Sequence, residues 1–171
     1  MEGLILQSPT PLAKTHRVEG FRCGEDALDT WLVRRAWRNQ LSGASRTYVA
    51  TSNERVAGYY CLSSGALALR DAPGGVRRNM PDPIPMAILG RLAVDRSWQG
   101  KGVGLALLRD AVQRTQAASA IIGIRGLLGQ KLEDGDTETA LVLAQKAFAL
   151  KPKNDEVADT LLRLQADKHD W

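Results

Sequence analysis

The chain has 171 residues, of which 44% are apolar and 25% charged, as in ordinary globular proteins. It contains no apolar run of about eighteen residues and no signal-peptide pattern at its start, so we expect a cytoplasmic protein without a membrane span. The two cysteines and two histidines are too few and too scattered to indicate a disulfide framework, a metal site or a Ser-His-Asp centre.

Charge and composition divide the chain near residue 128. Residues 1–128 contain 17 Lys and Arg against 10 Asp and Glu, whereas residues 129–171 contain 6 against 9. Fourteen of the 16 glycines and six of the seven prolines also precede this boundary. We therefore predict two pieces of different origin, residues 1–128 and residues 129–171.

The first part of the chain predicts a helix followed by a β-hairpin. Leu4–Leu6 is apolar enough to begin a strand, and Glu25–Asn39 has the apolar spacing of an amphipathic helix. Thr47–Thr51 and Arg55–Leu62 have the β-branched and aromatic residues of strands. The polar turn Ser52–Glu54 lies between them and predicts their pairing as a hairpin.

The next elements surround a glycine-rich turn. Pro73–Pro85 holds four prolines and two adjacent glycines, which predicts an irregular loop. Met86–Asp95 is an almost unbroken apolar run, typical of a buried central strand. The turn Gln99–Gly104 follows, and then a helix to about Thr115. Ala120–Leu128 is apolar and β-branched at its start, which predicts another buried strand.

The last part of the chain predicts a helical hairpin. Thr137–Leu150 and Asp155–Leu164 each place their apolar residues on one helical face, and Pro152 separates them.

The turn Gln99–Gly104 has the features of a phosphate-binding loop. A strand that leads through glycines into a helix presents backbone N–H groups and the positive end of the helix dipole to an anion. A Walker A string is absent, and a GxGxxG fingerprint fails because Leu107 occupies its third glycine position. The pattern [RQ]-x-x-G-x-[GA], an acetyl-CoA signature, is complete, although a tight strand-to-helix turn would explain a glycine loop that stood alone.

Five motifs together resemble the GCN5-related N-acetyltransferases, and in particular the acetyltransferase toxins of bacterial toxin–antitoxin pairs. They occur in the same order and at similar spacing as in that branch and cover residues 1–128. The motifs are Phe21–Gly24 with Leu28–Leu32, Ala57–Tyr60 with Leu62 and Ser63, Leu89–Asp95, Gln99–Gly104, and Ile124–Leu128.

The resemblance implies an α/β (α+β) fold, with a twisted mixed sheet flanked by helices, and acetyl-CoA as co-substrate without a metal. In this family the strand before the loop binds the pantetheine arm and the loop amides bind the pyrophosphate. The matching cofactor-binding residues are Leu92, Ala93, Val94, Gln99, Gly100, Lys101, Gly102, Val103 and Gly104.

The toxin branch implies an enzyme that acetylates the α-amine of aminoacyl-tRNA and so blocks translation. It also implies a cognate ribbon-helix-helix antitoxin and a homodimer. The basic balance of residues 1–128 fits a tRNA partner, although a solvated basic face explains it equally well. The candidate phosphate contacts are Arg34, Arg35, Arg38, Arg77 and Arg78, with Arg46 and Arg70 as further candidates.

The chain departs from this family after Leu128. The family continues with a helix that carries a tyrosine, the usual acid for the leaving thiolate, and with two more strands; here no tyrosine follows Tyr60. Residues 129–171 instead resemble a fragment of a tetratricopeptide repeat, as a natural fusion, a frameshift or a chimera would produce. The catalytic residue is therefore unknown. Two functions follow: an acetyltransferase toxin of impaired activity, or a non-catalytic acetyl-CoA-binding or protein-interaction remnant.

Overall fold

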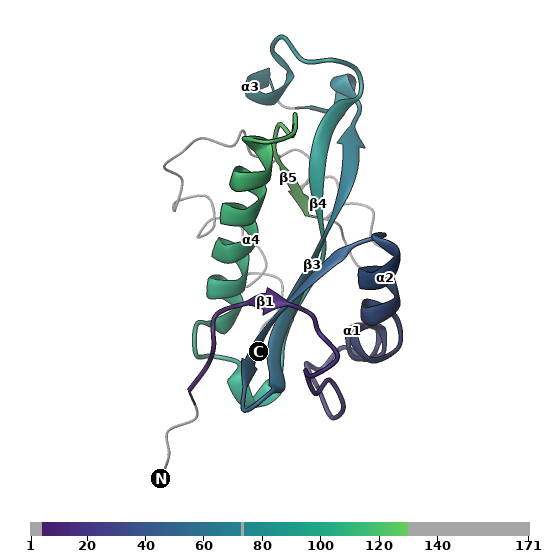
Figure 1. Ribbon diagram of the computed structural model, residues 1–171. Helices are drawn as coiled ribbons and strands as arrows, with labels where there is room; N and C mark the ends of the chain where they lie inside the picture. The colour runs from purple at the N-terminus through teal and green to yellow at the C-terminus, as the bar shows by residue number, and fades with distance from the viewer. Residues whose placement is uncertain (1–4, 73, 130–171) are drawn as a thin grey trace. The chain divides into compact units, whose positions relative to one another are not determined.

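The computed structural model describes residues 5–72 and 74–129, which form an α/β structure in two compact units. Among these residues, the first unit comprises 5–63 and 89–107, and the second comprises 64–72, 74–88 and 108–129. Five strands follow one another in the order β1-β2-β3-β4-β5 in one mixed sheet (Figure 1). The predicted mixed sheet with flanking helices is thus confirmed. The predicted helical hairpin and its repeat-like pattern lie outside the described residues.

The first unit contains one long helical segment, which confirms the helix predicted over Glu25–Asn39. It runs through α1 (Asp26–Trp31), a π-helical stretch η1 (Leu32–Ala36) and α2 (Trp37–Ser42) (Figure 1). Gly43 ends it with a φ of +77°, the left-handed conformation that glycine adopts most easily. The inward face of the segment consists of Leu28, Asp29, Trp31, Leu32 and Ala36.

The predicted hairpin of the first unit is also confirmed. Strands β2 (Arg46–Ser52) and β3 (Arg55–Leu67) pair antiparallel, and β3 extends beyond the predicted Leu62. Asn53 and Glu54 form the turn, with φ values of +50° and +64°. Two consecutive residues with positive φ give a turn whose twist matches that of the flanking strands.

The strand predicted at Leu4–Leu6 is wrong for its described residues, Ile5 and Leu6. Ile5 is 80% exposed, so its apolar side chain does not contribute to a sheet face. The strand β1 instead covers Thr10–Pro11, where it pairs antiparallel with β2. A proline has no N–H to donate, and β1 at the edge of the sheet is a position that tolerates this.

The buried strand predicted over Met86–Asp95 is confirmed as β4 (Ile84–Val94), which lies between β3 and β5 in the sheet. The 3-10 turn η3 (Arg96–Trp98) follows it, and then the helix α4 (Val103–Ser119), which continues beyond the predicted Thr115.

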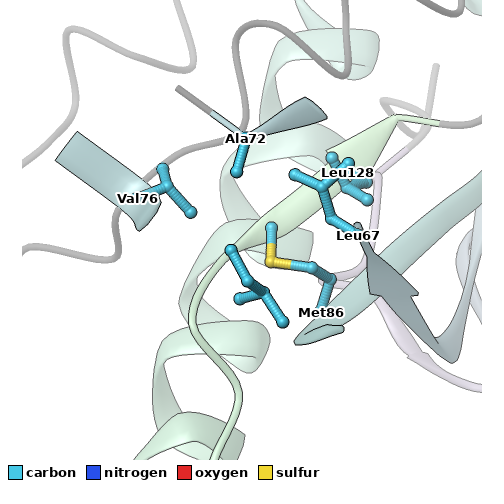
Figure 2. Close-up of a cluster of buried hydrophobic side chains, with 6 residues drawn as sticks. Leu67, Ala72, Val76, Met86 and Leu128 are labelled. Carbon is cyan, nitrogen blue, oxygen red and sulfur yellow. The ribbon is translucent and has the colours of Figure 1, made fainter. Parts of the chain in front are cut away.

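The second unit is built around an apolar cluster. Met86 is 1% exposed and Ile84 is fully buried, and both project from β4 into this cluster. Figure 2 shows Met86 beside Leu67 and Leu128, with Ala72 and Val76 on the loop side. The cluster comprises Leu67, Ala72, Val76, Ile84, Met86 and Leu128.

The loop predicted over Pro73–Pro85 is irregular only in part. It contains the short helix α3 (Gly74–Arg77) and the first two residues of β4, after the 3-10 turn η2 (Leu69–Asp71). Val76 is 2% exposed and anchors α3 in the apolar cluster. Burial of one side chain therefore orders a glycine-rich stretch that local preference alone would leave irregular.

The strand predicted over Ala120–Leu128 is largely wrong, since β5 covers only Leu127–Gly129. Ile121 and Ile122 are 85% and 57% exposed in a turn after α4. Leu127 and Leu128 of β5 are buried. The β-preference of Ile121 and Ile122 therefore indicated a strand at the start of this segment, whereas the strand forms at its end, where the leucines are buried.

Candidate functional site

The candidate site is the turn between β4 and α4, which lies wholly in the first unit at its helix start. Asp95 begins it as the cap of η3: its carboxylate accepts from the Ser97 amide at 3.0 Å and from the Ser97 hydroxyl at 2.6 Å. Burial alone would raise the pKa of Asp95, but hydrogen bonds from Ser97 and Arg22 outweigh it and lower the pKa. The turn therefore starts from an ionised carboxylate, both of whose oxygens accept hydrogen bonds.

Two exposed glycines give the turn its bare backbone. Gly100 and Gly102 have φ values of +70° and +77°, and a Cβ built on either would meet no atom within 4 Å. Any other residue would be strained there and would cover the backbone with a side chain. Gly104 lies in the first turn of α4, and a Cβ there would contact Val94 at 3.6 Å. The glycines thus keep open the approach to the start of α4.

The start of α4 supplies the donors for an anion. The first N–H groups of an α-helix have no partner within the helix, and the helix dipole makes this end positive. Val103 is 4% exposed, so its side chain anchors the helix in the core while its backbone begins the helix. A pyrophosphate fits this arrangement: exposed glycine backbone, helix amides and a positive dipole end meet at one place.

Lys101 is the cation between the two exposed glycines of the turn. Its ammonium group donates to the Ser97 carbonyl at 2.9 Å and lies 5.1 Å from the centre of the Trp98 ring. The side chain is exposed, so it adds positive charge beside the glycines without covering them.

The side chain of Gln99 forms hydrogen bonds within the protein. Its amide group donates to the carbonyls of Cys23 at 2.7 Å and Val94 at 2.9 Å. The backbone N–H of Gln99, directly after η3, donates to the Arg96 carbonyl at 3.4 Å. Sequence reasoning places Gln99 among the cofactor-binding residues but does not reveal this internal role.

The strand part of the predicted site, Leu92–Val94, forms the end of β4. Ala93 is buried, and its carbonyl oxygen would lie 3.2 Å from a Cβ built on Gly58 of β3. The same Cβ would lie 2.9 Å from Leu107 of α4, so only glycine at position 58 permits this close packing. In the sequence Gly58 stands out only as part of the motif Ala57–Tyr60, because the close packing of α4 against it depends on tertiary contacts.

An arginine that sequence reasoning did not assign lies on the same strand. The Arg91 guanidinium lies 4.4 Å from the centre of the Trp31 ring, and Trp31 stacks on Tyr59 at 5.9 Å. Burial raises the pKa of the Cys61 thiol and of the Tyr59 phenol, so both neighbours of this cation stay neutral. The Tyr59 hydroxyl donates to the Leu28 carbonyl at 2.9 Å and is therefore committed to the core.

The predicted basic residues are exposed in two separate groups. Arg34 and Arg35 lie on η1 and Arg38 on α2, so one helical segment of the first unit carries all three. Arg77 and Arg78 are exposed in and after α3 of the second unit. The further candidates have contacts within the protein: Arg46 donates to the Gln40 carbonyl at 2.7 Å, and Arg70 lies 3.8 Å from Asp71.

The described residues contain no group of three His, Cys, Asp or Glu side chains with the arrangement of a metal site. Burial raises the pKa of the Cys23 thiol to about 12, so it stays protonated at neutral pH. Over the same described ranges, no helix is long and apolar enough to cross a membrane.

Comparison with known proteins identifies the family. The family model "Acetyltransferase (GNAT) family" matches residues 14–125. A tRNA-acetylating toxin of Mycobacterium tuberculosis is 47% identical over 127 residues, which cover 74% of this chain and 76% of the relative.

This chain belongs to the GNAT acetyltransferase family.

Solved structures of GNAT toxins resemble this chain as well. AtaT complexed with acetyl-methionyl-tRNAfMet superposes with a TM-score of 0.70 at 31% identity, covering 76% of this chain and 80% of AtaT. A Tyr-to-Phe mutant of AtaT, bound to the C-terminus of the antitoxin AtaR and to acetyl-CoA, has a TM-score of 0.65 at 30% identity. That match covers 81% of this chain and 80% of the mutant.

Proposed function

We propose that this chain is a bacterial toxin of the GNAT family, an N-acetyltransferase that transfers acetyl from acetyl-CoA to the α-amine of aminoacyl-tRNA. One observation supports it most: the exposed backbone of Gly100 and Gly102 at the start of α4, directly after the buried strand β4. The similarity to the tRNA-acetylating toxin and to tRNA-bound AtaT supports the substrate. Acetylation of the α-amine would block translation.

In the proposed complex, the amides of Gly100–Gly104 bind the pyrophosphate, and the backbone of Leu92–Val94 aligns the pantetheine arm. Acetyl-CoA supplies an acetyl group that is already activated as a thioester. An α-amine with a pKa near ~8 is partly neutral at cytoplasmic pH, so the protein needs mainly to position two substrates. The helix dipole and the Lys101 ammonium group stabilise the negative charge of the pyrophosphate. Because charged tRNA is a cytoplasmic substrate, the proposed reaction takes place in the cytoplasm.

We propose that the arginines of the helical segment contact tRNA phosphates. Arg34, Arg35 and Arg38 are exposed on neighbouring turns, and each neutralised phosphate contributes to a salt-dependent affinity. Arg77 and Arg78 offer a second exposed pair. By similarity to AtaT with its antitoxin AtaR, we also propose a cognate antitoxin, of the ribbon-helix-helix type, and a homodimer.

The proposed reaction needs an acid that protonates the leaving thiolate, and the tyrosines of this chain do not supply an evident one. All three tyrosines lie between residues 48 and 60, and the phenol of Tyr59 is buried and bonded to Leu28. Without a positioned acid, the thiolate takes its proton from water, which we expect to lower the rate by ~10²–10⁴-fold. This favours a second candidate function, an acetyl-CoA-binding protein without transferase activity.

Two measurements test the proposal and separate the candidates. Calorimetry measures acetyl-CoA binding to the purified full chain, and radiolabelled acetyl-CoA with charged tRNA measures transfer to the α-amine. We expect binding together with slow transfer. Binding without transfer would leave the second candidate, and absence of binding would refute both.

A further inference from the structure

The loop Phe21–Gly24 of the first unit is bound to the phosphate-binding turn by three hydrogen bonds. The Arg22 amide donates to the Asp95 carboxylate at 2.9 Å, and the Arg96 amide donates to the Arg22 carbonyl at 2.8 Å. The Gln99 side chain donates to the Cys23 carbonyl at 2.7 Å. These contacts join residues more than seventy positions apart, so they are tertiary bonds that neither segment forms alone.

Each of the two side chains also holds its own turn. The Asp95 carboxylate accepts from Ser97 with its other oxygen, and Gln99 donates its second N–H to the Val94 carbonyl at 2.9 Å. An amide group has two N–H donors, and both are used here. Gln99 therefore links three segments: the end of β4, the glycine turn that it begins, and the loop Phe21–Gly24.

The same loop is anchored to α1. The Cys23 amide donates to the Asp29 carboxylate at 2.9 Å, and Asp29 is 5% exposed. The α1 carbonyl of Leu28 in turn accepts the Tyr59 hydroxyl at 2.9 Å. A continuous series of hydrogen bonds thus runs from the glycine turn through Cys23 to the segment that carries the exposed arginines.

We propose that Gln99 and Asp95 are positioning residues, which hold the loop Phe21–Gly24 against the glycine turn and thereby set the geometry in which Gly100–Gly104 presents its backbone. Gln99, the first position of the signature, then affects acetyl-CoA binding by ordering the turn and not by contacting the cofactor. Gln99 contributes two side-chain donors to carbonyls, and Asp95 contributes acceptors to two amides. This inference rests on the proposed acetyl-CoA site.

Substitutions at Gln99 test this role. Gln99→Met keeps the length and neutrality of the side chain but removes both donors, whereas Gln99→Arg keeps several N–H donors. We expect Gln99→Met to weaken acetyl-CoA binding by about tenfold, as the loss of two half-buried hydrogen bonds predicts. Gln99→Arg should stay within about threefold of the wild type. Gln113→Met, on an exposed face of α4, is the matched control and should not change the affinity.

Amide exchange in the ligand-free protein separates this proposal from the proposed function. If Gln99 holds the loop, Gln99→Met should accelerate exchange of the Arg22 and Arg96 amides, and Gln99→Arg should not. Asp95→Asn should be non-additive with Gln99→Met, because both side chains bind the same loop. If Gln99→Met fails to fold, Asp95→Asn alone must still accelerate exchange at Arg22. Unchanged exchange and unchanged acetyl-CoA affinity in the folded variants would overturn the proposal, whereas wild-type protein that binds no acetyl-CoA would overturn only the site.

Discussion

The two compact units use glycine and burial in different ways. In the first unit, Gly100 and Gly102 are exposed with positive φ, and the surrounding loops are joined by hydrogen bonds between charged, amide and backbone groups. In the second unit, a Cβ on Gly65 would overlap the Ile88 side chain, so glycine there permits close packing. Open glycines with positive φ beside a helix start, Gly100 and Gly102, can present their backbone to a ligand, whereas glycines in close packing, Gly65 and also Gly58 of the first unit, serve stability.

The apolar cluster of the second unit should show the largest loss of stability. Met86→Ala removes a side chain that is 1% exposed and leaves a cavity, so we expect the free energy of unfolding to fall by about 2–5 kcal/mol. Denaturant unfolding measures this. Met80→Ala, at the half-buried margin of the cluster, should cost less. Equal losses in both variants would contradict the difference in burial.

The glycine turn of the first unit should instead show a loss of binding. Gly102→Asp places a strained side chain and a negative charge beside the phosphate site, so we expect acetyl-CoA affinity to fall by about 100-fold or more, about 2.7 kcal/mol. Gly43→Asp is the matched control, since Gly43 has the same φ of +77° and open surroundings but lies at the end of α2. Calorimetry should find normal affinity in the control. Wild-type affinity in Gly102→Asp would remove the site assignment.

A buried hydroxyl in the first unit gives a smaller effect. Tyr59→Phe removes the hydrogen bond to the Leu28 carbonyl but keeps the ring that stacks on Trp31. We expect a loss of about 0.5–1.5 kcal/mol in the free energy of unfolding. Thermal unfolding together with acetyl-CoA binding would measure both properties. A loss of affinity with unchanged stability would show that the phenol acts in the site rather than in the core.

The pH dependence of Asp95 gives the smallest and most specific effect. Its pKa is lowered in the folded protein, so its contribution to stability is present above the unfolded pKa of about 3.9 and is lost as the pH falls through the folded value. Asp95→Asn should therefore be less stable than the wild type at pH 7, and the difference should shrink below about pH 4. Unfolding curves across this range measure the difference. A difference that stays constant with pH would show that ionisation of Asp95 does not contribute.

Elements with a strong pattern could be predicted from the sequence, and elements with a weak pattern could not. The apolar run Met86–Asp95 and the spacing of the segment Glu25–Asn39 predicted the right structures, because each pattern spans ten residues or more. Ala120–Leu128 was mistaken for a buried strand, since Ile121 and Ile122 have β-preference but are exposed in a turn. The short helix α3 depends on one buried residue, Val76, and has no periodic signal of its own.

The candidate site follows the same rule. The glycine signature predicted an exposed turn at Gln99–Gly104, and the structure has one, because positive φ and bare backbone before a helix are local properties of the sequence. Binding of a phosphate there is the proposal made above. Arg91 went unassigned, because its contact with Trp31 joins two segments that are sixty residues apart.

The sequence by itself determined that β4 is buried, that a glycine turn follows it and that α4 begins at the turn. These properties depend on backbone freedom and on the polarity of neighbouring residues, which short stretches of sequence encode. Only the tertiary structure decided what Gln99 and Gly58 do. Gln99 finds its carbonyl partner at Cys23, and Gly58 meets Leu107, in each case across a long separation along the chain. Such contacts depend on which surfaces the folded sheet brings together, and no local pattern records them.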